Sequence, residues 1–427
     1  MNQEKLVGLI FLLLLLSCNN YIAKNNDDNP DNEEQLDSLI GKTLPDWQDG
    51  YLDIHAINTG RGESFLYIFP DGTTMLVDAA GSLLSSSAEI PPTPAKPNST
   101  ITSGQVIINY TKHFIKATNN DKLNYILISH FHPDHMGNYS TSLPLAPAGN
   151  FRMGGVTEVG EKIPFETIID RGYPDYDFPT NIVSTDLISN YIKFINWAKT
   201  AYNATAEQFE VGENDQITLR RNPSRYTNFQ IRNIVADGKV WSGSGTGSTN
   251  TLPPIEELVT AEPNENIFSI GFHISYGLFD YFSGGDLQYN GKSTYSWKDI
   301  ETPVSDVMTA VDVIKANHHG TSNCNGEIYL NKLDPQVVLI HTWRDVQPNP
   351  ETIGRMYAAN NNCKIFITNM TDANKVRLAE YIHKIKSTQG HIIVRVAKDG
   401  LSYTVYILED TNEDYKVKKI FGPYQSN

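Results

Sequence analysis

The run HFHPDH at residues 130–135 constrains this chain more than any other feature of its sequence. It concentrates three of the chain's eleven histidines and one carboxylate within six residues. The run directly follows the apolar segment 125–129, which has the length and composition of a buried strand. Neutral imidazoles and carboxylates are ligands that Zn²⁺ prefers in proteins. The sequence therefore predicts four metal ligands where this strand ends: His130, His132, Asp134 and His135.

Two other predicted strands end in residues of the same chemical kind. Segment 279–283 leads into two glycines and Asp286, which is placed to bridge two metal ions. Segment 311–316 leads into the adjacent pair His318 and His319. Loops at strand ends, held by a rigid scaffold, are common positions for functional groups. We therefore expect the three strand ends to meet in one site.

Six segments carry a resemblance to a known family. The HxHxDH pattern resembles the signature of the metallo-β-lactamase superfamily, and the other segments resemble the ordered motifs of its ComEC-like branch. This branch includes the hydrolase domain of a DNA-uptake protein and phosphorylcholine esterases, and the resemblance covers roughly residues 51–368. It implies an α/β fold of four layers, αββα, with two mixed β-sheets sandwiched between helices. The other matching segments are NTGRGES at 58–64, LVDAAG at 76–81, NEN at 264–266, GDL at 285–287 and HHGTS at 318–322.

The resemblance also implies how the site is used. It predicts two divalent metal ions, with Zn²⁺ preferred and Mn²⁺ as the alternative. His319 is the expected last ligand, since the family's final histidine directly precedes a glycine, and His318 would then contact the substrate or protonate the departing oxygen. The opposite assignment of these two histidines stays open. We further expect Asp134 to orient the attacking water and Asp78 to support the ligand loop from a neighbouring strand.

Other residues bear on the substrate. Superfamily members that act on carbonyl compounds resemble one another in a ligand histidine between the first cluster and the bridging acid. In that interval this chain has only His273, whose alternating surroundings predict an ordinary strand residue. Arg171 is expected either to clamp an anionic substrate or to pair with Asp170 or Asp175. The branch usually carries Gln and Asp where this chain has Arg61 and Glu63.

Three functions follow as hypotheses. The leading one is a metal-dependent hydrolase that uses a metal-bridged water on a phosphodiester or phosphoester. The alternatives are a lactonase or β-lactamase that acts at a carbonyl, and a non-catalytic surface lipoprotein that binds a ligand. The net charge of −15 disfavours binding to bulk nucleic acid, so a small-molecule or cell-envelope substrate is expected.

The first residues predict export from the cytoplasm and attachment to a membrane. Lys5 precedes an apolar run that ends at Ser17 and Cys18, and residues 1–17 have the pattern of a secretory signal peptide. The run resembles a bacterial lipobox, which implies that Cys18 carries the lipid anchor on an extracytoplasmic membrane face. Residues 18–45 are acidic and predict a disordered tether.

The remaining residues, 46–427, are expected to form the hydrolase domain, with an insertion at about 140–262 and a C-terminal strand hairpin. The patterns predict helices over 107–117, 183–200 and 350–359 and a flexible Gly/Ser-rich loop over 241–250. Cys324 and Cys363 are either free or paired, and their spacing does not decide between the two.

Overall fold

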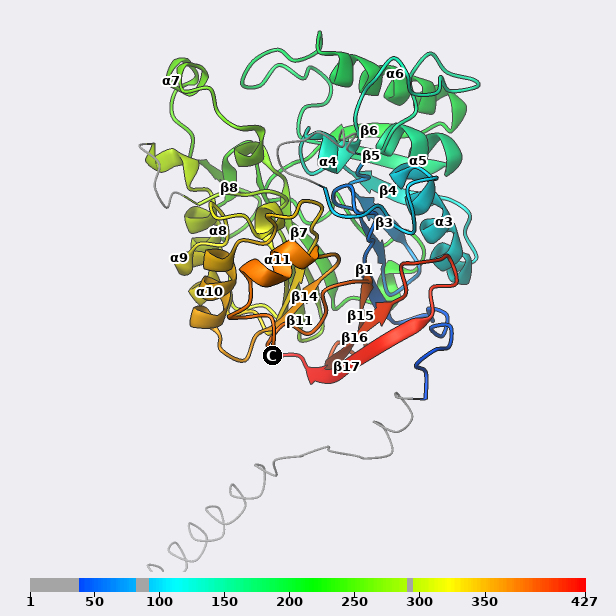
Figure 1. The fold of residues 1–427 in the computed structure, drawn as a ribbon. Coiled ribbons are helices and arrows are strands. Elements are labelled where there is room, and N and C mark those ends of the chain that lie inside the picture. Colours follow the sequence, from blue (N-terminus) through cyan, green and yellow to red (C-terminus); the bar gives the residue numbers. More distant parts are fainter. Residues whose placement is uncertain (1–37, 82–91, 290–294) are drawn as a thin grey trace, which may run out of the picture. The chain divides into compact units, whose positions relative to one another are not determined.

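The computed structural model describes residues 38–81, 92–289 and 295–427. Residues 41–427 form one compact unit (Figure 1). The predicted signal peptide, Cys18 and most of the predicted tether lie outside the described residues. Within the described part of the chain, no helix is long and apolar enough to cross a membrane.

The first sheet has nine strands among the described residues, in the order β17-β16-β15-β1-β2-β3-β4-β5-β6. Strands β3 to β6 are parallel to one another, and the remaining neighbours, including β2 and β3, pair antiparallel. Strand β4, which lies between two parallel neighbours, is buried along its whole length, as expected for a parallel strand covered on both faces. The strands are β1 (Leu52–Ala56), β2 (Phe65–Ile68), β3 (Thr74–Val77), β4 (Leu123–Leu127), β5 (Phe165–Asp170), β6 (Thr205–Gln208), β15 (His391–Val396), β16 (Ser402–Leu408) and β17 (Val417–Gln425).

The second sheet has eight strands in the same described ranges, in the order β14-β13-β12-β11-β10-β7-β8-β9. Strands β11 to β14 are parallel, so their carboxyl ends share one edge of the sheet. The strands are β7 (Phe229–Ala236), β8 (Lys239–Trp241), β9 (Ser248–Asn250), β10 (Gly271–Tyr276), β11 (Phe279–Ser283), β12 (Val313–Lys315), β13 (Val337–Ile340) and β14 (Lys364–Ile367).

The two sheets pack face to face around one apolar core. This core combines residues of both sheets, and the hydroxyls of Tyr67 on β2 and Tyr281 on β11 meet across it at 2.9 Å. A second core joins the other face of the second sheet to helices α8 to α10. Alternate side chains along β2 point to opposite faces, which lets one strand serve the central core and an outer layer.

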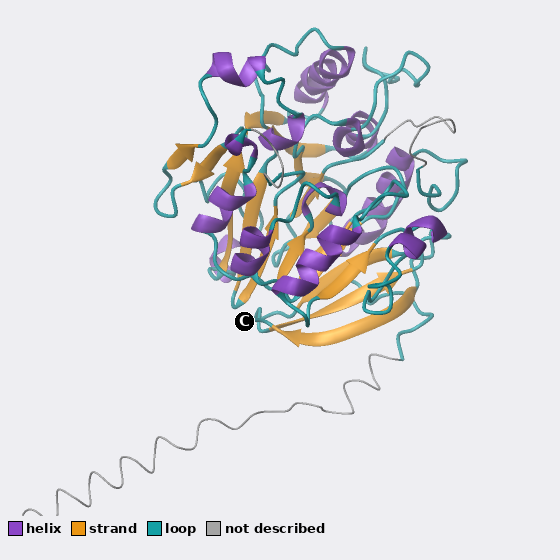
Figure 2. Cartoon of the chain, turned by 60° about the vertical axis from the view of Figure 1, so that its left-hand side comes forward, coloured by secondary structure: helices purple, strands orange, loops and turns teal. Residues whose placement is uncertain are grey.

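Helices cover the outer faces of both sheets (Figure 2). Helices α3, α5 and α6 connect the parallel strands of the first sheet, and α8, α9 and α10 lie beside the second (Figure 1). The expected αββα layering with two mixed sheets is therefore confirmed. The helices are α3 (Ser103–Ile115), α4 (Pro133–Met136), α5 (Val156–Lys162), α6 (Asp186–Ala201), α7 (Ile255–Thr260), α8 (Glu301–Val307), α9 (Glu327–Leu333), α10 (Pro350–Ala359) and α11 (Asp372–Arg377).

Several local expectations need correction. Helix α3 begins at Ser103 rather than 107, because Thr102 accepts a hydrogen bond from the Gln105 amide and caps the helix there. The Gly/Ser-rich segment 241–250 is not simply a loop, since β8 and β9 pair across it. The C-terminal hairpin gains a third strand, β17, which pairs with β16. Cys324 and Cys363 are both buried free thiols.

Candidate metal centre

Three strand ends meet at one edge of the two-sheet core. Beyond β4 the chain reaches α4, a single turn that begins at Pro133 with His132 as its N-cap. Proline suits the first helical position because its fixed φ fits the turn and its missing N–H would be unpaired there. Asp286 follows β11, and His319 follows β12. The parallel register of β11 with β12 brings the last two loops together.

The donor cluster consists of four predicted residues, Asp134, His135, Asp286 and His319, of which all but Asp134 are buried. The Nε2 atom of His135 lies 3.2 Å from Asp286 Oδ2 and 3.3 Å from His319 Nε2. His319 Nε2 lies 3.6 Å from Asp286 Oδ2 and 3.3 Å from Asp134 Oδ2. Ligands about 2.1 Å from a tetrahedral Zn²⁺ are separated by about 3.4 Å. The spacing and chemistry of this cluster therefore fit a divalent metal ion.

A second set of donors lies on the other side of Asp286. His130 Nε2 is 3.1 Å from His132 Nδ1 and 3.9 Å from Asp286 Oδ2. Asp286 thus stands between the pair His130 and His132 and the cluster around His135. On this side of Asp286 the donors are therefore two imidazoles and the shared carboxylate.

The adjacent histidines after β12 have different surroundings. His319 is buried, and its Nδ1 lies 3.2 Å from the carbonyl oxygen of His341, which leaves Nε2 free to face the donor cluster. His318 Nε2 lies 3.0 Å from the side-chain amide of Asn266, and 22% of its side chain is exposed. Both histidines have positive φ, an unusual conformation for residues with a side chain that is often found at functional sites. The geometry therefore favours His319 over His318 as the metal donor.

Asp78 supports the cluster from behind. Its Oδ2 lies 2.7 Å from His135 Nδ1, so the imidazole donates there and keeps Nε2 available. The same carboxylate accepts from the Ser129 backbone N–H and hydroxyl, both at 2.7 Å. Burial opposes protonation of His135, but the carboxylates of Asp286 and Asp78 raise the pKa of its imidazole well above the ordinary value. The surroundings of His135 therefore favour a positive charge at this imidazole.

Glu63 and Lys315 are additional members of the site that the sequence interpretation missed. Glu63, His135, Asp286 and His319 have donor atoms that all lie within 4.8 Å of one another. Lys315 Nζ lies 3.1 Å from Glu63 Oε2 and 3.4 Å from Asp286 Oδ1. The available signal was Lys315 itself, a charged residue at the end of the apolar strand β12.

The structure corrects the expectation for Arg171. Its guanidinium is buried and forms ion pairs with Glu265 at 2.7 Å and Asp237 at 2.9 Å, not with Asp170 or Asp175. Its NH1 also donates to the carbonyl oxygen of Phe178. A guanidinium whose N–H groups are bound by these three partners has few donors left to bind a substrate.

The position of Arg171 indicates a structural role. Glu265, its bidentate partner, also accepts a hydrogen bond at 2.9 Å from the backbone N–H of Phe131. Phe131 lies between the first two histidines of the cluster. Arg171 therefore supports the histidine loop through Glu265.

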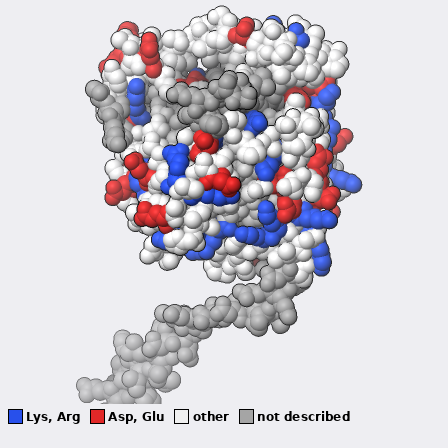
Figure 3. Space-filling model, in the orientation of Figure 1, with Lys and Arg blue, Asp and Glu red and all other residues white. Residues whose placement is uncertain are grey.

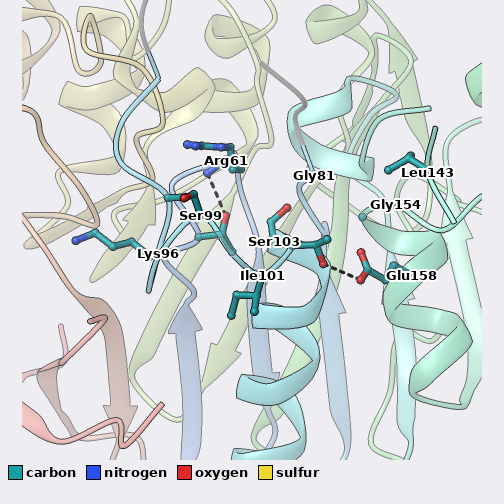
Figure 4. A pocket seen from close by; sticks show the side chains of 13 residues that line it. Arg61, Gly81, Lys96, Ser99, Ile101, Ser103, Leu143, Gly154 and Glu158 are labelled. Carbon is teal, nitrogen blue, oxygen red and sulfur yellow. Dashed lines mark hydrogen bonds between the residues drawn. The ribbon is translucent and has the colours of Figure 1, made fainter. Parts of the chain in front are cut away.

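A cavity of about 170 Å³ lies beside the turn that carries Glu63. Figure 4 shows Arg61 on one side of it and Glu158 on the other, and Glu158 accepts a hydrogen bond from Thr102. None of the lining residues belongs to the donor cluster. The cavity is therefore a neighbour of the metal centre and not the centre itself.

Comparisons with known proteins give only distant similarity. No protein-family model matches the chain, and no curated protein matches it. Three solved structures are similar at low identity. A mutant of the CmlA beta-hydroxylase is 12% identical at a TM-score of 0.35, over 81% of this chain and 54% of that one. A protein assigned as a metal-dependent hydrolase from Parabacteroides distasonis is 12% identical at a TM-score of 0.35, over 75% and 94%. Zn(2+)-bound PqqB from Methylobacterium extorquens is 8% identical at a TM-score of 0.34, over 75% and 98%. This chain thus spans about half the length of the hydroxylase.

Proposed function

We propose that this chain is a metal-dependent hydrolase of the metallo-β-lactamase superfamily, within its ComEC-like branch, and that it cleaves phosphodiesters or phosphoesters. One observation carries the proposal. Asp286 Oδ2 lies 3.2 to 3.9 Å from the Nε2 atoms of four histidines, which come from two different strand ends: His130, His135, His318 and His319. Such a centre suits two divalent ions that share one carboxylate, Zn²⁺ first and Mn²⁺ as the alternative.

The charges of the site favour bound cations. Burial opposes the negative charge of Asp286, but His135, His319 and Lys315 hold the pKa of this carboxyl well below its usual range. When bound, two divalent ions would polarise a phosphoryl oxygen and lower the pKa of the attacking water towards neutrality.

The protein's own side chains supply the remaining roles in the proposed reaction. Asp134 is the more open carboxylate of the cluster, at 16% side-chain exposure against 1% for Asp286, and it orients the water. His318 is more exposed than His319, at 22% against 1%, and it contacts the departing oxygen. Contact with the departing oxygen requires hydrogen-bond reach in the substrate complex.

The missing middle histidine supports phosphoester over carbonyl chemistry. Between the first cluster and Asp286 the chain offers only His273, on strand β10. Its Nε2 pairs with Asp280 at 2.8 Å, within the β10–β11 hairpin. His273 is therefore occupied as a strand residue and does not fill the position that lactonases and β-lactamases use.

The substrate is proposed to be a small molecule or a component of the cell envelope. On the face shown in Figure 3, Lys and Arg are interspersed with Asp and Glu. The net charge of −15 adds to this argument, since nucleic acid binding relies on clustered positive charge. Attachment to a membrane through Cys18 would place the enzyme at the extracytoplasmic side, near such substrates.

The test combines metal analysis with turnover of a chromogenic phosphodiester, a phosphorylcholine ester and a cephalosporin by the full chain in detergent. We expect about two divalent ions per chain and turnover of one of the phosphoesters. Asp134→Ala should lower turnover by at least 100-fold, in the range found when a positioned acid–base group is lost. Turnover of the cephalosporin alone would refute the phosphoester proposal, and a fully active Asp134→Ala variant would refute the site.

The proposed anchor has a separate test. Cys18→Ser removes the atom that would carry the lipid, and the protein should then leave the membrane fraction. The expectation follows because several acyl chains on one residue give durable attachment, which this substitution would remove. Unchanged membrane partition of Cys18→Ser would show that the chain is held in another way.

A further inference from the structure

Lys315 is a fully buried ammonium beside the proposed metal centre. It is the last residue of β12, and its side chain has no exposed surface. An ammonium in such a place is costly unless acceptors surround it. Its Nζ contacts Glu63 Oε2, Asp286 Oδ1 and the carbonyl oxygen of Gly285. Nζ donates hydrogen bonds to Asp286 Oδ1 and to the Gly285 carbonyl, and it forms an ion pair with Glu63.

The two oxygens of Asp286 face different groups. Oδ1 faces Lys315 at 3.4 Å, whereas Oδ2 faces the four imidazoles of the site at 3.2 to 3.9 Å. Because a carboxylate is planar, a contact that fixes the position of Oδ1 also fixes the direction of Oδ2. The backbone N–H of Asp286 donates to the hydroxyl of Ser269 at 3.1 Å, which holds the base of the residue.

We propose that Lys315 is a positioning residue that holds Asp286 Oδ1, so that this aspartate presents a single oxygen, Oδ2, to the metal ions. Glu63 is then the counter-charge of Lys315 and not a metal ligand. The inference rests on the metal centre of the proposed function and is independent of whether the substrate is a phosphoester.

The position of Glu63 favours the role of counter-charge. Glu63 has a donor atom within 4.8 Å of those of His135, Asp286 and His319. Its Oε2 is nonetheless closer to Lys315 Nζ, at 3.1 Å, than to His319 Nδ1, at 3.8 Å. The nitrogen of His319 that it approaches is the one beside the carbonyl oxygen of His341. Glu63 therefore contacts His319 at Nδ1, whereas Asp134 and Asp286 face its Nε2.

Two variants separate the roles of these residues. Glu63→Gln removes the counter-charge and leaves Lys315 on Asp286. The double variant Glu63→Gln with Lys315→Met also removes the cation, and it leaves the summed charge of the pair as it is in the native protein. Replacing both partners of a buried pair by uncharged groups of similar shape is often close to neutral for folding. Circular dichroism and thermal unfolding of the metal-free proteins check this.

The measurement is titration of the full chain with Co²⁺, followed by its visible absorption spectrum, which reports the ligands around the ion. Relative to Glu63→Gln, the double variant loses one positive charge, and charge alone would strengthen the binding of another cation. Loss of positioning predicts the opposite. We expect 10- to 100-fold weaker Co²⁺ binding, the usual effect of removing a group that orients a ligand, together with a changed spectrum.

The outcomes distinguish the proposals. Glu63→Gln should keep the native spectrum, and a spectrum that changes in this variant would make Glu63 a ligand and overturn the inference, whether or not the double variant folds. Equal or tighter Co²⁺ binding by the double variant would also overturn it. A native protein that binds no Co²⁺ would overturn the proposed function together with this inference.

Discussion

Asp78→Asn tests whether Asp78 Oδ2 supports the metal centre through its contact with His135. The variant keeps the shape of a fully buried side chain but replaces one acceptor oxygen by an NH₂ group. The amide oxygen can still accept from the Ser129 N–H, as Oδ1 does now at 2.7 Å. The NH₂ group then faces His135 Nδ1, which must become an acceptor, and the imidazole proton moves to Nε2. Nε2 is the nitrogen that faces Asp286 at 3.2 Å, so its lone pair is lost to a metal.

The expected loss can be estimated from the bond that is broken. A hydrogen bond to a charged group contributes about 1.5–3 kcal/mol, and each 1.4 kcal/mol is tenfold in affinity. Metal binding by Asp78→Asn should therefore weaken by roughly 10- to 100-fold, which agrees with the usual effect of such supporting residues. Isothermal titration calorimetry with Zn²⁺ and Mn²⁺ measures the difference directly.

Ser64→Ala is a matched control for this variant. The Ser64 hydroxyl donates at 2.9 Å to the main-chain carbonyl of Asp78, so its loss affects the same residue but not its carboxylate. We expect metal affinity within about threefold of the native protein, since only a neutral hydrogen bond of about 1 kcal/mol is removed and the carboxylate keeps its contacts. If Asp78→Asn also stays within threefold, the reasoning about the tautomer of His135 is refuted.

Three further changes probe other parts of the fold. Gly62→Ala should abolish metal binding, because the new Cβ would lie 2.2 Å from the carbonyl oxygen of Asp134. The control Gly41→Ala places its Cβ in open space and should bind metal normally in the same titration. Arg171→Leu should lower the free energy of unfolding, measured in urea, by about 3–5 kcal/mol, since two carboxylates lose their buried partner. Unchanged stability together with a raised KM would instead support the role of Arg171 in binding an anionic substrate. Burial lowers the pKa of His391 to about 4, so the neutral ring stabilises the fold fully above pH 6.5, and this contribution of up to about 3 kcal/mol is lost as the pH falls towards 4. His391→Gln should lose less stability in urea between pH 7 and pH 4.5 than the native protein does, and an equal loss would contradict the assignment.

The identities of the donors were predictable from the sequence because they are local. Each donor lies within a few residues of a strand end, and an apolar strand followed by a cluster of histidines or glycines is visible without a structure. The αββα layering was implied by the same motifs through family resemblance. Asp78 was predictable for the same reason, since it directly follows strand β3, which lies parallel beside β4.

The partners of these donors were not predictable, because they depend on contacts between distant segments. Glu63 and Lys315 meet only after the two sheets have packed, since one precedes β2 and the other ends β12. Arg171 finds Glu265 and Asp237 at 94 and 66 residues away, in preference to acids only a few residues from it.

The sequence by itself determined which side chains this protein has for binding metal, and where each would stand relative to its own strand. Only the tertiary structure decided which oxygen of Asp286 faces the imidazoles and which faces Lys315, and which of His318 and His319 enters the donor cluster. The physical reason is that the order of residues along a strand is set locally. The direction of a carboxylate or an imidazole is set by buried charges and carbonyl groups, which sheet packing brings from elsewhere in the chain.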